Sequence, residues 1–174
     1  SRGHVVRLRF VGANPDPVIE GGEDLPGKGN YFVGNDPAQW KRGIPTYGQV
    51  RYRELWPGID LVYRGQGGRL KYEFVVKPGA DPSQIRLAYR GIEGMSVSDA
   101  GDLILKTASG ELRDSRPIAY QEIGGRRVAV EAGFRVEAPK AHLDLDSRRA
   151  SISSPTLYVK SVPVFWLPWI NLPL

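Results

Sequence analysis

Few side chains in this sequence are of the types that commonly carry catalysis. None of its 174 residues is a cysteine, so a thiolate nucleophile, a thiolate metal site and a disulfide are all excluded. The two histidines, His4 and His142, lie in strand-like stretches beside apolar neighbours, where packing or surface roles are usual. Two histidines also fall short of a typical zinc site without help from carboxylates. The sequence therefore predicts no catalytic residue, no bound metal and no cofactor.

Paired carboxylates are the remaining route to catalysis, because glycoside hydrolysis needs two acids that flank the scissile bond. By residue type alone the candidates are Asp60, Glu73, Asp81 and Glu93. Asp60 and Asp81 each closely follow a Pro-Gly turn, where an aspartate usually accepts hydrogen bonds from backbone amides. Glu73 alternates with Lys71 on the outward side of a predicted strand, as a cross-strand charge partner does. A glycoside hydrolase is therefore only a remote alternative.

The elements that would position such residues are mostly β-strands, because apolar and polar residues alternate along much of the chain. Residues 4–11, 68–76 and 83–91 each place apolar side chains on one face and charged side chains on the other. An Asp-Ala-Gly triplet ending at Gly101 and a Gly-Gly pair starting at Gly124 predict hairpin turns. Turn signals recur about every ten residues, which is typical of an antiparallel sandwich.

Helix signals are scarce. Asp36 and Asp81 each stand before a proline, which predicts an N-cap followed by a short helical turn. The predicted fold class is therefore all-β, an antiparallel β-sandwich similar to a jelly roll, with one or two short helical turns. A seam near residue 138 divides the chain into an expected sandwich module, residues 1–138, and an expected β-strand extension, residues 139–174. An unpaired terminal strand would allow self-association.

The net charge of +5 arises in the first half of the chain. Residues 1–90 hold 14 Lys and Arg against 9 Asp and Glu, whereas the remaining residues hold 10 against 10. Part of the excess comes as strand-spaced pairs, at Arg7 and Arg9 and at Arg51 and Arg53, each on one face of a strand. Solvated strand faces explain these pairs better than nucleic-acid binding, since neither a recognition helix nor an RNA-binding sheet motif is present. We therefore expect no nucleic-acid partner.

Aromatic residues gather in one stretch, interleaved with arginines. The candidate ligand-binding residues are Trp40, Tyr47, Tyr52 and Trp56. Flat rings offer a glycan or a peptide a large contact area with little entropy to lose. Trp and Tyr are also common strand formers that fill sandwich cores. The core interpretation is favoured, because Tyr52 and Val50 share one alternating face.

Longer motifs carry a family resemblance. The strings "NYFVGNDPAQW" (30–40), "PGIDLVY" (57–63) and "LKYEFVVKPGADPSQI" (70–85) follow one another along the chain. Over about residues 4–137 the chain resembles the N-terminal domain of large secreted bacterial proteins with seven-bladed β-propeller (SBBP) repeats. Lys71 departs from that family, which usually has an acid before the tyrosine. The resemblance implies a β-rich extracellular or cell-surface module with propeller repeats as neighbouring domains, and it brings no catalytic residues.

The end of the chain resembles a different family. The string "VPVFWLPWINLPL" after "TLYVKS", within residues 141–174, is similar to the junction of jelly roll and barrel in the outer-membrane lipopolysaccharide-assembly protein. This resemblance implies lipopolysaccharide and an outer-membrane barrel as partners, and a periplasmic or outer-membrane location. Three prolines in thirteen residues exclude a transmembrane helix there. The candidate interface or membrane-proximal residues are Phe165, Trp166 and Trp169.

Three functional hypotheses follow from these observations. The first is a non-catalytic extracellular or cell-envelope β-module, a structural or adhesive adaptor to neighbouring domains that binds glycans or protein partners. The second is the periplasmic part of an outer-membrane lipopolysaccharide-assembly protein. The third and most remote is a glycoside hydrolase. The first rests on the longer resemblance and on the absence of catalytic side chains that converge on a site.

Overall fold

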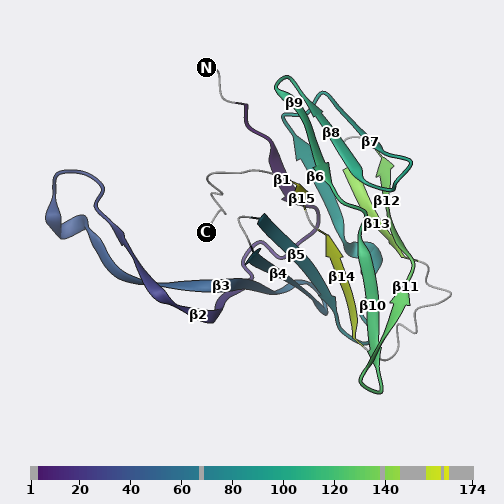
Figure 1. The fold of residues 1–174 in the computed structure, drawn as a ribbon, viewed down its shortest axis with the longest axis horizontal. Coiled ribbons are helices and arrows are strands. Elements are labelled where there is room, and N and C mark those ends of the chain that lie inside the picture. The colour runs from purple at the N-terminus through teal and green to yellow at the C-terminus, as the bar shows by residue number, and fades with distance from the viewer. Residues whose placement is uncertain (1–3, 67–68, 138–139, 146–155, 162, 165–174) are drawn as a thin grey trace.

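The computed structural model describes residues 4–66, 69–137, 140–145, 156–161 and 163–164 (Figure 1). Within these ranges the chain forms strands and two 3-10 turns, and every strand pair is antiparallel. The predicted all-β antiparallel fold is thus confirmed. The two turns are η1 (Pro37–Gln39) and η2 (Pro82–Gln84). As predicted, the side chains of Asp36 and Asp81 cap them by accepting backbone N–H bonds two residues on.

The strands form three sheets. The first sheet has the order β1 (Arg7–Phe10), β6 (Arg86–Arg90), β13 (Lys140–Leu145) and β12 (Ala132–Glu137). The second has the order β11 (Arg126–Val130), β10 (Ile118–Ile123), β14 (Leu157–Ser161), β5 (Arg69–Val76), β4 (Ile59–Gln66), β3 (Lys41–Trp56) and β2 (Val18–Tyr31). The third has the order β15 (Pro163–Val164), β9 (Gly110–Asp114), β8 (Leu103–Thr107) and β7 (Gly94–Val97).

Both predicted hairpins are present. β7 pairs with β8 across the turn that contains Gly101, and β10 pairs with β11 across Gly124 and Gly125. The φ angles of these last two residues are 56° and 74°, a left-handed conformation that glycine adopts without a steric penalty. Consecutive positive φ angles match the tight turn that suits the right-handed twist of the flanking strands.

A hydrophobic core collects side chains from all three sheets. Among its largest buried members are Trp56 and Phe74, whose ring centroids lie 5.9 Å apart. The indole N–H of Trp56 donates to the carbonyl of Val11 at 3.0 Å, so its polar atom is satisfied inside the core. The Tyr72 hydroxyl donates to Asp114 at 2.6 Å and thereby joins the second sheet to the third. On β5 and β6 the apolar face that the alternating pattern predicts is buried, since Phe74, Leu87 and Tyr89 are at most 6% exposed.

The two parts expected on either side of residue 138 share their sheets. β13 lies between β6 and β12, and β14 lies between β5 and β10 (Figure 1). Val159 of β14 is 1% exposed and belongs to the same core as Phe74. In the described part of the chain, strands beyond residue 138 therefore lie in the same sheets as strands of residues 1–138. The edges of β5, β6 and β10 carry backbone N–H and C=O groups that need hydrogen-bond partners, and β13 and β14 supply them.

Candidate functional site

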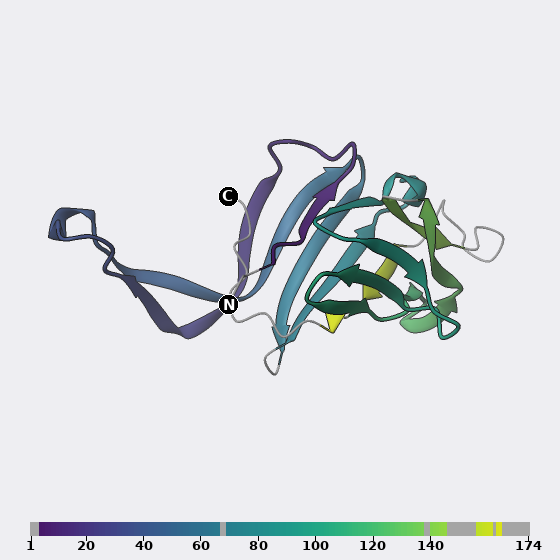
Figure 2. The ribbon, with the colours of Figure 1, turned by 90° about the horizontal axis from the view of Figure 1, so that it is seen from above.

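The β2–β3 hairpin continues well beyond the rest of its sheet. β4 pairs with β3 only between Gln49 and Trp56, whereas β2 pairs with β3 along almost its whole length. Residues 23–48, called the arm from here on, therefore form a two-stranded ribbon that projects away from the other strands (Figures 1 and 2). No residue of the arm is buried.

The base of the arm depends on two glycines. A Cβ atom on Gly21 would lie 2.5 Å from the ring of Tyr47, and one on Gly22 would lie 2.6 Å from the side chain of Gln49. The ring and the amide of these β3 residues therefore lie directly against β2, where only glycine leaves room. An ion pair between Arg64 on β4 and Glu23 links the arm to the sheet. These contacts fix the direction in which the arm leaves the sheet.

The tip of the arm is held together by its own hydrogen bonds. The turn η1 is closed by the backbone N–H of Trp40, which donates to Pro37 at 3.2 Å. The indole N–H of Trp40 donates to the carbonyl of Gly34 at 3.2 Å. The Asn30 side chain accepts the backbone N–H of Gly43 at 2.9 Å and so bridges the two strands. A tip held in this way would have little conformational entropy to lose in any binding event.

Three side chains form an aromatic–arginine cluster at the tip, which consists of Phe32, Trp40 and Arg42. The two rings meet edge to face with centroids 5.1 Å apart. The guanidinium carbon of Arg42 lies 5.3 Å from the centroid of Phe32 and 5.6 Å from that of Trp40. Phe32 is 56% exposed and the adjacent Val33 is 75% exposed. Aromatic residues and arginine dominate the binding energy of many protein interfaces, so this composition fits a docking surface.

The four candidate rings do not form one binding face. Trp40 lies in the tip cluster and Tyr47 lies on the shaft of the arm, where it is 42% exposed. Tyr52 and Trp56 are 9% and 2% exposed and belong to the core. Tyr52 and Trp56 lie in the part of β3 that pairs with β4, which begins at Gln49, so their rings are packed. Trp40 and Tyr47 come before that part and remain outside the core. Phe165, Trp166 and Trp169 lie outside the described residues.

The arm itself was not predicted from the sequence. Phe32 in particular was not singled out, although it precedes the capped turn η1 by only a few residues. The signal that was available is the pair of aromatic residues on either side of an Asp-Pro start, preceded by the glycine-rich stretch 21–29. Such a stretch predicts turns rather than strands, because glycine and proline are uncommon within strands, and the ribbon was therefore missed.

The family model described as Domain of unknown function (DUF7948) matches residues 1–152. The chain belongs to this family. Searches of curated proteins and of solved structures find no match. The DUF7948 match includes the whole arm, and it ends before β14, the strand that joins β5 to β10.

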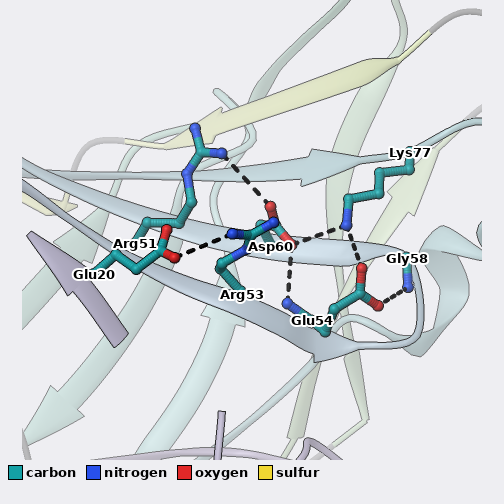
Figure 3. A network of polar contacts seen from close by, with 7 residues as sticks. All are labelled: Glu20, Arg51, Arg53, Glu54, Gly58, Asp60 and Lys77. Carbon is teal, nitrogen blue, oxygen red and sulfur yellow. Dashed lines mark hydrogen bonds and ion pairs between the residues drawn. The ribbon is translucent and has the colours of Figure 1, made fainter. Parts of the chain in front are cut away.

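A polar network on the outer face of the second sheet surrounds Asp60, which is 3% exposed (Figure 3). Asp60 accepts the backbone N–H of Glu54 at 2.9 Å, and its carboxylate lies 3.5 Å from Lys77 and 3.8 Å from Arg51. Glu54 has a φ of 50° at an irregularity in the β3–β4 pairing. A hydrogen bond from Lys77 and another from the Gly58 backbone lower the pKa of Glu54. Asp60 thus acts as the backbone acceptor expected from the sequence.

A second buried carboxylate lies farther along the same face. Glu73, 7% exposed, stands directly opposite Lys160 of β14, and the two charged groups are 3.1 Å apart. Burial by itself lowers the pKa of Lys160, but hydrogen bonds with Tyr120 and Glu73 raise it above its ordinary value. The ring of Tyr120 stacks on Tyr158 at 5.1 Å. Glu73 is therefore the cross-strand charge partner that the sequence predicted, with Lys160 on the opposite strand.

Other potential sites are sparse in the described part of the chain. A ring nitrogen of His4 lies 2.5 Å from the carbonyl oxygen of Gly91, on the surface. His142 stands on β13 opposite Arg86 and Arg135. The described residues contain no group of three or more His, Asp or Glu placed to hold a metal ion. Among the same residues, no helix is long and apolar enough to cross a membrane.

Proposed function

We propose that this chain is a non-catalytic β-module that serves as a structural adaptor, and that its arm docks onto a neighbouring protein domain. The observation that carries this proposal is the arm. All of its residues, 23–48, are at least partly exposed, and its tip presents the aromatic–arginine cluster. A two-stranded ribbon is only marginally stable in water without a third strand or a packed face. A docking partner would supply the missing contacts.

The chemistry of the tip defines the partner that it fits. Phe32 and Val33 offer exposed apolar surface, which favours an apolar pocket on the partner. Within the described part of the chain, Lys41 and Arg42 make no ion pair. Carboxylates at the rim of the pocket would complement these cations and orient the arm. The partner is therefore a folded protein domain with an apolar pocket and an acidic rim.

The setting of this adaptor is part of the same proposal. The resemblance to the domain that precedes SBBP repeats supports an extracellular or cell-envelope location, with propeller repeats as the neighbouring domains. The lipopolysaccharide-assembly interpretation is supported only by the resemblance of residues 141–174. The hydrolase interpretation has less support, because Asp60 and Glu73 are both held in ion pairs that serve the packing of the sheet.

Site-specific photo-crosslinking tests the adaptor proposal. A photoreactive amino acid at Val33, in the full-length gene product in its own cells, should give an adduct that maps to one protein domain. The matched control is Val128 on β11, which is 44% exposed but lies on the body. The substitution Arg42→Glu should lower the adduct yield at position 33 by about tenfold, since it places like charge against the acidic rim.

The results that contradict the proposal are equally specific. Similar adducts from positions 33 and 128 would show that the arm has no preferred partner. Turnover of a glycan substrate that is lost on substitution of Asp60 or Glu73, with the fold intact, would replace the adaptor by an enzyme. An Arg42→Glu variant that forms the adduct as well as the parent chain does would refute the acidic rim.

A further inference from the structure

The outer face of the first sheet is rich in arginine. Its described arginines are Arg7 and Arg9 on β1, Arg86 and Arg90 on β6, and Arg135 on β12. All five are exposed. Phe10, Leu87, Tyr89 and Phe134, which alternate with them, belong to the core or pack against it, whereas Leu8 is 42% exposed. This set of five side chains is called the arginine face below. Alternation along the strands places all of them on one side of the sheet.

Two of these arginines stand directly opposite each other. The register of β1 and β6 pairs Arg7 with Arg90, and Arg9 with Ala88. Like charges at directly opposed positions destabilise a sheet, because their Cβ atoms are only about 4.5–5.5 Å apart. Within the described part of the chain, Arg7, Arg9 and Arg90 make no ion pair. The pairing of β1 with β6 therefore brings positive charges together, with no carboxylate of the described residues within ion-pair distance.

The remaining positions of the face add little negative charge. Arg86 donates from Nε to the carbonyl of Ser83 at 3.4 Å, and Arg135 lies 3.7 Å from Glu137. Glu137 is the one acidic residue on this side of the described parts of β1, β6 and β12. β13 runs between β6 and β12 and brings Lys140 opposite Ala88, His142 opposite Arg86, and one further acid, Asp144, opposite Gly133.

The outer face of the second sheet is arranged differently. There Arg53 pairs with Glu20, Lys77 with Glu54 and Lys160 with Glu73, and the buried carboxylate Asp60 lies near Arg51. One molecule thus has one sheet face whose cations have acidic partners and another whose arginines have almost none. Unpaired arginines that are held together by strand register form a site for a ligand that carries the missing negative charge.

We propose that the arginine face binds a linear anionic polysaccharide. Two guanidinium groups on opposed strand positions can share one carboxylate or sulfate, and arginine binds such groups through two parallel hydrogen bonds. Positions two residues apart on a strand are separated by about 6.6 Å, so successive acidic groups of an extended polymer can meet successive arginines. This binding site lies in a different sheet from the arm and is independent of the arm's partner.

The face fits a polysaccharide better than a nucleic acid. Single-stranded nucleic acids bind through bases stacked on aromatic rings, and the described outward positions of β1, β6 and β12 contain no aromatic residue. A flat sheet face also cannot enter the major groove, where the base pairs of a duplex are read. An acidic polymer needs only a surface of guanidinium groups with regular spacing.

The test measures binding of fluorescent polygalacturonate to the whole chain at low salt, with neutral dextran and a 20-base-pair DNA duplex as comparisons. The face variants are Arg7→Gln and Arg90→Gln. The matched controls are Arg53→Gln and Arg127→Gln, whose arginines are 53% and 67% exposed and pair with Glu20 and Glu122 on the second sheet. Each face variant should weaken polygalacturonate binding by about threefold to tenfold, and each control by less than about twofold. Binding should also weaken as salt screens the charges.

Unfolding of the same variants separates binding from folding. Loss of one arginine from the opposed pair removes a like-charge contact, so Arg7→Gln should unfold at the same urea concentration as the parent chain or a higher one. Weaker binding in a variant of equal or higher stability is the expected result. Equal effects of the face and control variants would overturn the proposal in favour of general charge attraction. Tighter binding of the duplex, or no binding of polygalacturonate at low salt, would overturn it too.

Discussion

Removal of the Asp60 carboxylate is the sharpest test of how the second sheet is held together. Asp60→Ala leaves the backbone N–H of Glu54 without its acceptor and takes a shared counter-charge from Lys77 and Arg51. A hydrogen bond to a charged, buried group contributes about 1.5–3 kcal/mol. The residue whose N–H this carboxylate accepts, Glu54, has a left-handed backbone with a φ of 50°. We therefore expect the free energy of unfolding to fall by about 3 kcal/mol.

Two further variants divide this value into its parts. Asp60→Asn keeps an oxygen that can accept the Glu54 N–H but removes the negative charge. Lys77 and Arg51 are 41% and 39% exposed, so solvent screens their ion pairs and the loss should be about 1 kcal/mol. Glu20→Ala removes a carboxylate that is 44% exposed and pairs with Arg53 on the same face. That change should cost no more than about 1 kcal/mol.

Urea unfolding followed by tryptophan fluorescence measures all three variants, since Trp56 is buried in the core. The dependence of the unfolding free energy on urea should keep the parent slope, which shows that the same surface is exposed. For a chain of this length the Tm of Asp60→Ala should fall by about 6–12 °C. A loss within about 0.5 kcal/mol of that of Glu20→Ala would refute the structural role assigned to Asp60.

Three further predictions address the core, the arm and the response to pH. Trp56→Ala should lower the free energy of unfolding by about 3–5 kcal/mol and Trp40→Ala by less than about 1 kcal/mol, and equal losses would contradict the division between core and arm. Gly21→Ala forces a Cβ to within 2.5 Å of the Tyr47 ring and should cost about 1–3 kcal/mol in urea unfolding, whereas Gly65→Ala, with no atom within 4 Å, should cost less than about 1 kcal/mol. Burial, together with Tyr52 and Asp114, raises the pKa of Tyr63 above its ordinary value of 10.0. Because the folded state holds this proton more tightly, the associated stability is present below pH 10 and is lost as the pH rises above it. Tyr63→Phe should therefore show a shallower loss of stability above pH 10 in urea titrations, and an unchanged slope would contradict the burial of the hydroxyl.

Much of the fold follows from local patterns. The alternation in residues 68–76 and 83–91 predicts which side chains are buried, and Phe74, Ile85 and Leu87 are all at most 1% exposed. The role of Asp81 as a cap follows from its place before a proline, since the backbone N–H two residues on is within its reach. These features depend on neighbours a few positions away in the chain, which a single sequence displays directly.

Features that depend on contacts between residues far apart in the sequence could not be predicted from local patterns. Glu73 alternates outward, yet it is 7% exposed, because Lys160 and Tyr120 lie against it from strands far away in the sequence. The place of β14 between β5 and β10 likewise depends on which strand edges remain open, and no local pattern records that. The length of the arm likewise depends on a non-local pairing, because the arm begins where β4 no longer pairs with β3. In each case the order of strands in the sheet decides the outcome.

The distribution of charge partners separates the parts of the molecule that hold the fold from those available to ligands. Asp60 and Glu73 are buried, and Asp60 has two cations within 4 Å while Glu73 has Lys160, so further counter-charge there would change little. At the arm tip and on the arginine face the cations are exposed and keep their hydration, so solvent screens much of the repulsion between them. Apart from Glu137, 3.7 Å from Arg135, no described acid forms an ion pair with the cations at those two places, so a carboxylate or sulfate on a ligand would supply the missing counter-charge. Under both proposals a ligand can therefore gain binding free energy at Arg42 and at Arg7. The rings of Tyr52 and Trp56 are already packed in the core and offer a ligand no free surface.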